Sequence, residues 1–270
     1  MPDNIQQQIR KAGLDGWLLA DFQGSNPIAR QLLRHPDALL TRRWFWWIPA
    51  RGQAVVLVHQ IEAGQFRGFE GKVETYITWQ ELRRQLAALL ANCDRIAMEY
   101  SPLGQVPYIS RVDAGTLELV RQTGVEVVSS ADLVQLVEAR WGQLGLDLHC
   151  DAARLVMQAK DEAFLYLGEA LADGRKITEY DVQRFLEDRL DALELVTDGA
   201  PIVAVNQNSA DPHYLPTARS HQPIGADDFV LLDVWAKRDL PEAIYADITW
   251  VAYAGAVVPE RYRRVFEVVR

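Results

Sequence analysis

Two apolar stretches near the end of this 270-residue chain each carry a single aspartate in their middle. Asp233 lies within residues 230–235 and Asp247 within residues 244–250, and both stretches have the composition of β-strands. The segment between them is polar and contains Pro241, which predicts a hairpin loop. Because aspartate is depleted in strand interiors, two of them in neighbouring strands are less probable as accidents than one.

A hairpin centred on Leu240 would place Asp233 directly opposite Asp247. Residues opposed in this way have Cβ atoms about 4.5–5.5 Å apart, and two ionised carboxylates at that separation repel each other. A pair of divalent cations would remove the repulsion, because carboxylate oxygens suit manganese, cobalt or zinc. The alternative is a bulge that turns one aspartate toward solvent, and the residue pattern alone leaves both interpretations open.

The rest of the chain predicts two domains, residues 1–140 and 141–270. In the first, helical and extended patterns alternate, which indicates an α/β domain. In the second, long helices precede extended segments, and Thr178 is placed to cap the second of these helices. The expected helices cover residues 5–12, 78–90, 113–124, 133–141, 148–171, 178–193 and 259–270, and the expected strands cover residues 16–20, 44–49, 54–59, 95–98, 125–128, 202–205, 229–235 and 244–253.

Composition excludes several classes of protein. A net charge of −9 without a basic patch argues against a nucleic-acid partner. Two cysteines cannot form a disulfide framework. The N-terminus carries no signal-peptide pattern, and no apolar run is long enough to span a membrane, so we expect a cytoplasmic protein.

Around the aspartates the sequence resembles the M24-type metallopeptidases, which include prolidase (Xaa-Pro dipeptidase), aminopeptidase P and methionine aminopeptidase. Residues 231–233 followed by residues 245–249 resemble the paired-aspartate signature of that family. Pro212-His213-Tyr214 resembles its active-site histidine segment, and the region from Gly13 onward is similar to the creatinase-like domain of prolidases. The resemblance implies an α/β creatinase-like N-terminal domain and an α+β pita-bread catalytic domain, in which a curved antiparallel sheet lies behind paired helices.

The resemblance also implies roles for individual residues. Asp233 would bind one metal ion and Asp247 would bridge two, with manganese expected first and cobalt or zinc as alternatives. His213 would lie beside the metals and support the substrate, a proline-containing peptide. A metal-bridging hydroxide would attack the peptide bond that precedes proline. Both dipeptidase and aminopeptidase action fit this pattern, and a homodimer is expected from the family.

The sequence departs from the family pattern in ways that bear on activity. Trp235 and Trp250 stand where small and basic residues are common, changes that would narrow the site or alter substrate choice. The family completes its site with a later histidine and two later glutamates, whereas Glu260 and Glu267 fall on the last expected helix. That helix still runs at Arg270, so we expect a truncated catalytic domain that binds metal weakly and has no peptidase activity alone.

Two other functions remain open. A metal-free creatinase-like hydrolase of C–N bonds would share the fold, although the presence of both aspartates argues against it. A non-catalytic pita-bread binding protein is the second. The remaining histidines have no partners at metal-ligand spacing and are expected to be solvated or structural; they are His35, His59, His149 and His221. The aromatic run at residues 44–47 is expected to pack in the core or at a dimer interface.

Overall fold

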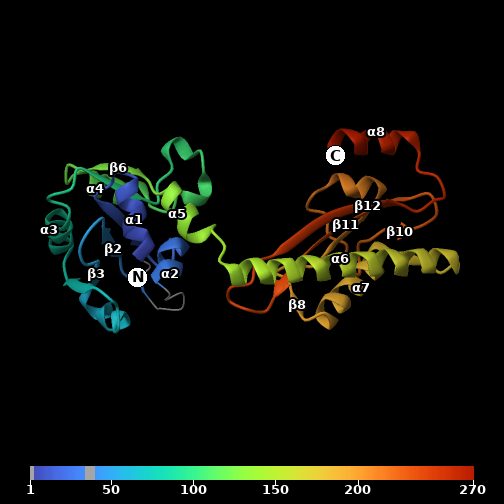
Figure 1. Cartoon of the computed structure of the whole chain (residues 1–270), viewed down its shortest axis with the longest axis horizontal. Coiled ribbons are helices and arrows are strands. Elements are labelled where there is room, and N and C mark those ends of the chain that lie inside the picture. Colours follow the sequence, from blue (N-terminus) through green and yellow to red (C-terminus); the bar gives the residue numbers. More distant parts are fainter. Residues whose placement is uncertain (1–2, 34–39) are drawn as a thin grey trace. The chain divides into compact units, whose positions relative to one another are not determined.

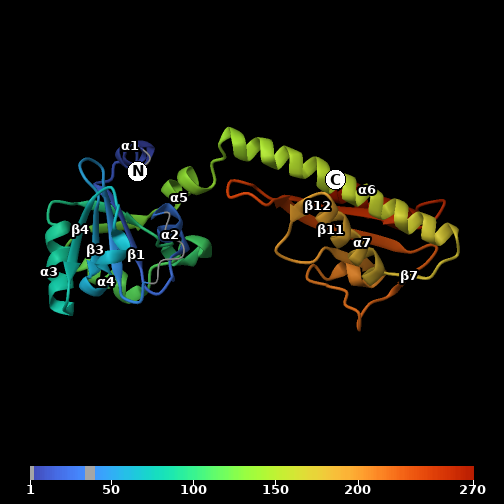
Figure 2. The same ribbon diagram turned by 90° about the horizontal axis from the view of Figure 1, so that it is seen from below.

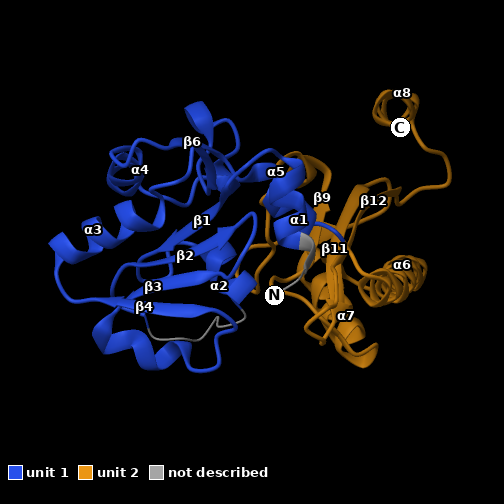
Figure 3. Cartoon of the chain, turned by 60° about the vertical axis from the view of Figure 1, so that its left-hand side comes forward, with its two compact units in different colours: residues 1–140 blue, residues 141–270 orange. Residues whose placement is uncertain are grey.

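A computed structural model describes residues 3–33 and 40–270 (Figure 1). The chain divides into two compact units, residues 1–140 and residues 141–270, which Figure 3 shows in blue and orange. His35 lies outside the described residues. In the described part of the chain, no helix is long and apolar enough to cross a membrane.

Unit 1 is built on a mixed sheet with the strand order β4-β3-β2-β1-β5-β6. The pairs β1–β2 and β2–β3 are antiparallel, and the other neighbours are parallel. The strands are β1 (Gly16–Asp21), β2 (Trp44–Pro49), β3 (Val55–His59), β4 (Lys72–Tyr76), β5 (Arg95–Met98) and β6 (Glu126–Ser129). The helices are α1 (Asp3–Lys11), α2 (Pro27–Leu33), α3 (Trp79–Leu89), α4 (Ala114–Arg121) and α5 (Ala131–Glu138), with shorter 3-10 turns at Gln60–Phe66, Pro102–Gly104 and Pro107–Ile109.

Helices cover both faces of this sheet because alternate strand residues point to opposite sides. Side chains of α1, α2 and α5 pack against one face, where they meet Trp17, Trp44 and Trp46. Side chains of α3 and α4 pack against the other face, where they meet Phe45 and Trp47. All the aromatic side chains of residues 44–47 are buried, which confirms the core interpretation. The three layers form the α/β architecture expected from the alternating pattern.

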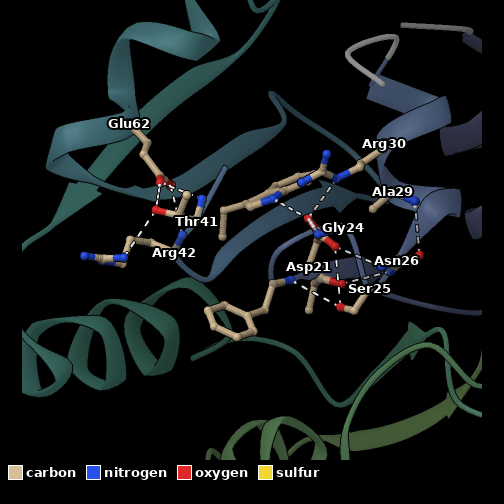
Figure 4. Close-up of polar contacts among 12 residues, drawn as sticks. Asp21, Gly24, Ser25, Asn26, Ala29, Arg30, Thr41, Arg42 and Glu62 are labelled. Carbon is tan, nitrogen blue, oxygen red and sulfur yellow. Dashed lines mark hydrogen bonds and ion pairs between the residues drawn. The ribbon is translucent and has the colours of Figure 1, made fainter. Parts of the chain in front are cut away.

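Buried carboxylates organise the loops of unit 1 (Figure 4). Asp21 accepts hydrogen bonds from the backbone N–H of Asn26 (2.8 Å), from Arg30 Nε (3.1 Å) and from Trp44 Nε1 (3.0 Å). Glu62 accepts hydrogen bonds from the backbone N–H and the hydroxyl of Thr41 at 2.7 and 2.8 Å. These contacts fix the polar loop after β1 and the segment that enters β2.

A third buried carboxylate, Glu99, joins the end of β5 to this loop. It is completely buried and accepts hydrogen bonds from Trp17 Nε1 and Asn26 Nδ2, both at 2.5 Å, and from Ser130 Oγ at 3.4 Å. Burial raises the pKa of Glu99 to about 7, although these hydrogen bonds act in the opposite direction. A protonated carboxyl can therefore exist inside this unit near neutral pH.

Unit 2 consists of helices α6 and α7 packed on one face of an antiparallel sheet, with α6 running along β11 and β12 (Figure 2). The helices are α6 (Gln143–Ala172), α7 (Glu179–Ala192) and α8 (Glu260–Val269). The strands are β7 (Ile177–Thr178), β8 (Leu195–Val196), β9 (Ile202–Val205), β10 (Pro223–Ile224), β11 (Phe229–Arg238) and β12 (Ala246–Tyr253), and a 3-10 turn covers Asn206–Ala210. The sheet places β12 beside β11, and β11 also pairs with β9 and β8.

Two local features set the ends of these elements. The Thr178 hydroxyl accepts the backbone N–H of Asp181 while the Asp181 carboxylate accepts the N–H of Thr178, a capping box that begins α7 as expected. At the C-terminal end of β11, the Arg238 side chain donates to Asp151 of α6 and to the backbone carbonyls of Leu193 and Glu194. These bonds hold the end of β11 against α6 and the end of α7, where residues 237 and 238 pair with β8.

Candidate metal site

The two predicted aspartates lie on neighbouring antiparallel strands, Asp233 on β11 and Asp247 on β12. Along β11 the side chains of Val230, Leu232, Val234 and Ala236 are buried in the core formed with α6 and α7. Because side chains alternate along a strand, Asp233 points to the opposite face of the sheet. Asp247 follows the buried Ala246, the partner of Ala236, and therefore points to the same face as Asp233.

The predicted register of this hairpin is wrong by two residues. Asp233 pairs with Thr249, and Asp247 pairs with Trp235. The last pair of the hairpin is Ala236 with Ala246, so the connecting residues 237–245 are centred on Pro241, one residue later than expected, and residues 237 and 238 of β11 pair with β8 instead. The two aspartates are therefore diagonal neighbours, for which Cα separations of about 7–8 Å are typical rather than the closest cross-strand contact. A shift of two residues keeps both carboxylates on one face.

The two carboxylates are close enough for the charge of one to act on the other. Partial burial raises the pKa of Asp247, and the negative charge of Asp233 raises it further. A hydrogen bond from the backbone of Ile248 acts in the opposite direction. The Thr249 hydroxyl donates to Asp233 Oδ1 at 2.7 Å and fixes one carboxylate oxygen. A cation bound by both groups would relieve the repulsion, and carboxylate oxygens are ligands that manganese accepts.

Two further expectations concern the tryptophans. Trp250 pairs with the buried Leu232 and stacks over the ammonium group of Lys160 on α6, 4.3 Å from its ring centre. It therefore faces the helix, and the expectation that it narrows the site is wrong. Trp235 shares a face with Asp233, and its indole N–H donates to Asp198 Oδ1 at 2.6 Å.

His213 lies in the segment between β9 and β10. Its side chain is exposed, and its backbone N–H donates to the Asp211 carboxylate at 2.9 Å. Within the described residues, no hydrogen bond or ion pair joins the His213 ring to either aspartate, and no group of three or more His, Cys, Asp or Glu side chains is arranged to hold a metal ion. The role of His213 therefore stays a prediction.

Other histidines make local contacts. A ring nitrogen of His149 lies 2.9 Å from the Tyr245 carbonyl, which ties the start of α6 to the hairpin, and one of His221 lies 2.8 Å from the Thr217 carbonyl. His59 accepts the backbone N–H of Ile61 at the start of a 3-10 turn. These contacts agree with the structural interpretation of each.

Sequence reasoning missed two residues near the candidate site. Thr249 could have been found, because it lies two positions after Asp247 on a strand and must therefore share its face. Glu179 falls in the first turn of the expected helix 178–193, where an acidic side chain complements the helix dipole, and nothing in the sequence indicates another role for it. It is instead completely buried and accepts hydrogen bonds from the backbone N–H groups of Val205 and Gln222, which lie 26 and 43 positions further along the chain. Spacing alone carries no signal for contacts of that range.

Comparisons with known proteins agree with the resemblance. Residues 148–270 match the model of metallopeptidase family M24. No curated protein sequence matches the chain. Among solved structures, dipeptidase PepE from Mycobacterium ulcerans is similar over 96% of this chain and 65% of its own length, with a TM-score of 0.67 and 17% identity. The present chain thus spans about two thirds of that protein.

Two further structures are similar at low identity. The Xaa-Pro dipeptidase from Bacillus anthracis matches 99% of this chain and 68% of its own, with a TM-score of 0.59 and 16% identity. An X-prolyl aminopeptidase from Caenorhabditis elegans, described as a cytosolic enzyme with a di-nuclear active site, matches 96% of this chain and 41% of its own, with a TM-score of 0.62 and 15% identity. Together with the family match, these likenesses confirm the pita-bread fold of unit 2.

Proposed function

Because residues 148–270 match metallopeptidase family M24, we propose that this chain is of the metal-dependent exopeptidase class that cleaves the peptide bond before proline. The observation that carries the proposal is the pair Asp233 and Asp247, diagonal neighbours on one face of the β11–β12 hairpin. The names of the similar structures, which include an Xaa-Pro dipeptidase and an X-prolyl aminopeptidase, support this choice of substrate. The N-terminal unit is then the creatinase-like domain, and we propose a cytoplasmic homodimer.

The two aspartates fit the chemistry of the implied metals, since both offer hard oxygen ligands and neither has a cationic partner among the described residues. Asp233 would bind one metal ion, with its carboxylate oriented by Thr249, and Asp247 would bind both metal ions. When bound, two divalent ions, manganese first and cobalt or zinc as alternatives, supply a Lewis acid to the peptide carbonyl. His213 would orient the substrate by hydrogen bonding.

Among the described residues, no third His, Cys, Asp or Glu side chain is grouped with this pair, so a polypeptide of residues 1–270 should bind manganese weakly and hydrolyse no peptide. We expect millimolar Mn²⁺ to raise the melting temperature of unit 2, because a ligand that binds only the folded state stabilises it. The double variant Asp233→Ala/Asp247→Ala should lose this shift. Asp239→Ala, which removes an exposed carboxylate from the hairpin loop, is the matched control and should keep it.

Each outcome of this experiment has a consequence. If Mn²⁺ produces no shift in the unaltered chain, the metal site is not usable and a non-catalytic binding protein becomes the better assignment. If the double variant keeps the shift, the ions bind elsewhere. Manganese-dependent hydrolysis of an Xaa-Pro peptide by residues 1–270 would overturn the expectation of inactivity.

Thr249 provides a finer test of the same site. Its hydroxyl is expected to hold Asp233 in the orientation that binds metal, and loss of such a supporting hydrogen bond typically weakens metal binding by about 10–100-fold. We expect Thr249→Val to weaken manganese binding by at least about 10-fold, measured by titration calorimetry. Thr249→Ser keeps the hydroxyl and should bind as the unaltered chain does. Equal affinities for the Val and Ser variants would contradict this role.

A further inference from the structure

The segment between β9 and β10, residues 206–222, is held at both ends by one side chain. Glu179 accepts the backbone N–H of Val205 at 2.7 Å and that of Gln222 at 2.7 Å, one on each carboxylate oxygen. Its own backbone N–H donates to the Gln222 carbonyl at 3.0 Å. The two ends of the segment are thus fixed to the first turn of α7.

The same carboxylate also reaches the middle of the segment. Asn208 Nδ2 donates to Glu179 Oε1 at 2.9 Å, and the Tyr214 hydroxyl donates to Glu179 Oε2 at 2.5 Å. Burial of the phenol, followed by its hydrogen bond to Glu179 and the negative charge of Glu179, raises the pKa of Tyr214. The phenol therefore stays protonated and remains a donor. Tyr214 is the residue directly after His213.

Glu179 makes these contacts at a cost. Its side chain is completely buried, and among the described residues its partners are backbone N–H groups, an amide and a phenol rather than a cation. Burying an unpaired carboxylate is unfavourable unless hydrogen bonds satisfy its oxygens. Here they do, with donors on both oxygens, and the positive end of the α7 dipole adds to them. Only a carboxylate accepts hydrogen bonds at both of these positions. A glutamine amide would turn its NH₂ group, which is itself a donor, toward two of the donors.

The position of the segment connects this cluster to the aspartates. It begins where β9 ends, and β9 pairs with β11 so that Ile202 lies opposite Asp233. Glu179 fixes the end of β9 and the side chain of Tyr214, the residue after His213. It therefore fixes the path of the chain between β9, which pairs with the strand of Asp233, and His213.

We propose that Glu179 is a positioning residue, which through Tyr214 holds His213 beside the Asp233–Asp247 pair. This inference rests on the proposed function, since it needs a metal at that pair and His213 near it. Neither Glu179 nor Tyr214 would touch the metal or the substrate. Their effect is to restrict the histidine to one place before a peptide binds.

The test uses the paramagnetism of Mn²⁺, which broadens the nuclear magnetic resonance signals of nearby atoms. The chain of residues 1–270 is labelled with ¹³C-histidine, and substoichiometric MnCl₂ is added, which suits weak binding. The His213 ring signal, assigned with His213→Gln, should broaden strongly. The broadening should disappear in Asp233→Asn/Asp247→Asn, where the ions have no site.

The discriminating variant is Tyr214→Phe, which keeps the ring and removes the bond to Glu179. We expect the broadening of His213 to fall to about half or less, because it decays with the sixth power of distance and a loosened support allows a displacement of about 1 Å. Tyr180→Phe is the matched control, because it removes another hydroxyl from the adjacent position on α7 without touching Glu179, and it should behave as the unaltered chain does. Glu179→Gln is the second variant and should also reduce the broadening.

The outcomes separate the two proposals. Backbone spectra of β11 and β12 show whether each variant is folded. If His213 broadens equally in the unaltered chain, Tyr214→Phe and folded Glu179→Gln, the positioning role is wrong while the metal site stands. If Mn²⁺ binds at the aspartates but His213 does not broaden in the unaltered chain, the histidine is not at the site. The proposed role of His213 and this inference then fail together.

Discussion

Replacing Glu99 with glutamine should largely remove one component of the pH dependence of unit 1. The ordinary pKa of a glutamate is 4.5, and burial raises that of Glu99 to about 7. Between these pH values the folded chain binds the proton more tightly than the unfolded chain, so the free energy of unfolding falls as pH rises. A rise from 4.5 to about 7 corresponds to about 3 kcal/mol, lost progressively between about pH 4.5 and pH 7.

Glu99→Gln cannot ionise, so this loss is absent from the variant. At pH 5 the variant should be less stable than the unaltered chain by about 1–2 kcal/mol, since its amide cannot accept from both Trp17 and Asn26. At pH 8 the order should be reversed. Urea unfolding between pH 5 and pH 8, followed by hydrogen exchange of peptides from β1 and β5, measures unit 1 separately. Parallel stability curves for the two proteins would show that Glu99 does not titrate in this range.

Gly16→Ala should destabilise unit 1 by about 3 kcal/mol, the upper part of the range for overpacked cores. Gly16 lies in β1, and a Cβ atom added there would stand 2.1 Å from Cη2 of Trp47. The Trp47 ring is 5% exposed and packs among the side chains that meet α3 and α4, so it has little room to move. The same hydrogen-exchange measurement reports the change, as faster exchange in β1 and β2.

A control and a second-site change make this prediction specific. Gly64→Ala is in the same unit, has no heavy atom within 4 Å of the added methyl group, and should change stability by less than about 0.5 kcal/mol. Shortening the obstructing ring with Trp47→Leu in the Gly16→Ala background should recover part of the loss. If Gly16→Ala is as stable as Gly64→Ala, the close approach of the ring is not a constraint.

Most long elements could be predicted because their residue patterns are strong. The apolar positions of α6, among them Leu155, Val156, Ala159 and Ala163, form one stripe and are buried together. Strand β4 and helix α2 were not predicted. β4 is a strand because it pairs in parallel with β3, and its charged residues, Lys72 and Glu74, leave no strictly apolar face to mark it. Gly16 was expected only as the first residue of a strand, because only the folded structure shows the Trp47 ring packed over it.

The candidate site could also be predicted only in part from the sequence. The aspartate pair could be predicted because two acidic residues within apolar strands conflict with strand composition. The register could not be predicted from a hairpin centred on Leu240, because residues 237 and 238 pair with β8 and Arg238 contacts Asp151, partners that are distant in sequence. The contacts of Glu179 could not be predicted for a related reason. Its partners come from Val205 to Gln222, and no local pattern indicates that one carboxylate collects them.

The diagonal arrangement of Asp233 and Asp247 also affects how such a site can change. Each carboxylate has its own neighbour across the strands, Thr249 for Asp233 and Trp235 for Asp247. Along each strand the same two residues are also the next ones on that face, because Trp235 follows Asp233 and Thr249 follows Asp247 by two positions. The four side chains thus form one square, in which Trp235 and Thr249 each neighbour both carboxylates. A single substitution at position 235 or 249 therefore changes the surroundings of both carboxylates, so metal preference and access for a substrate are expected to change together.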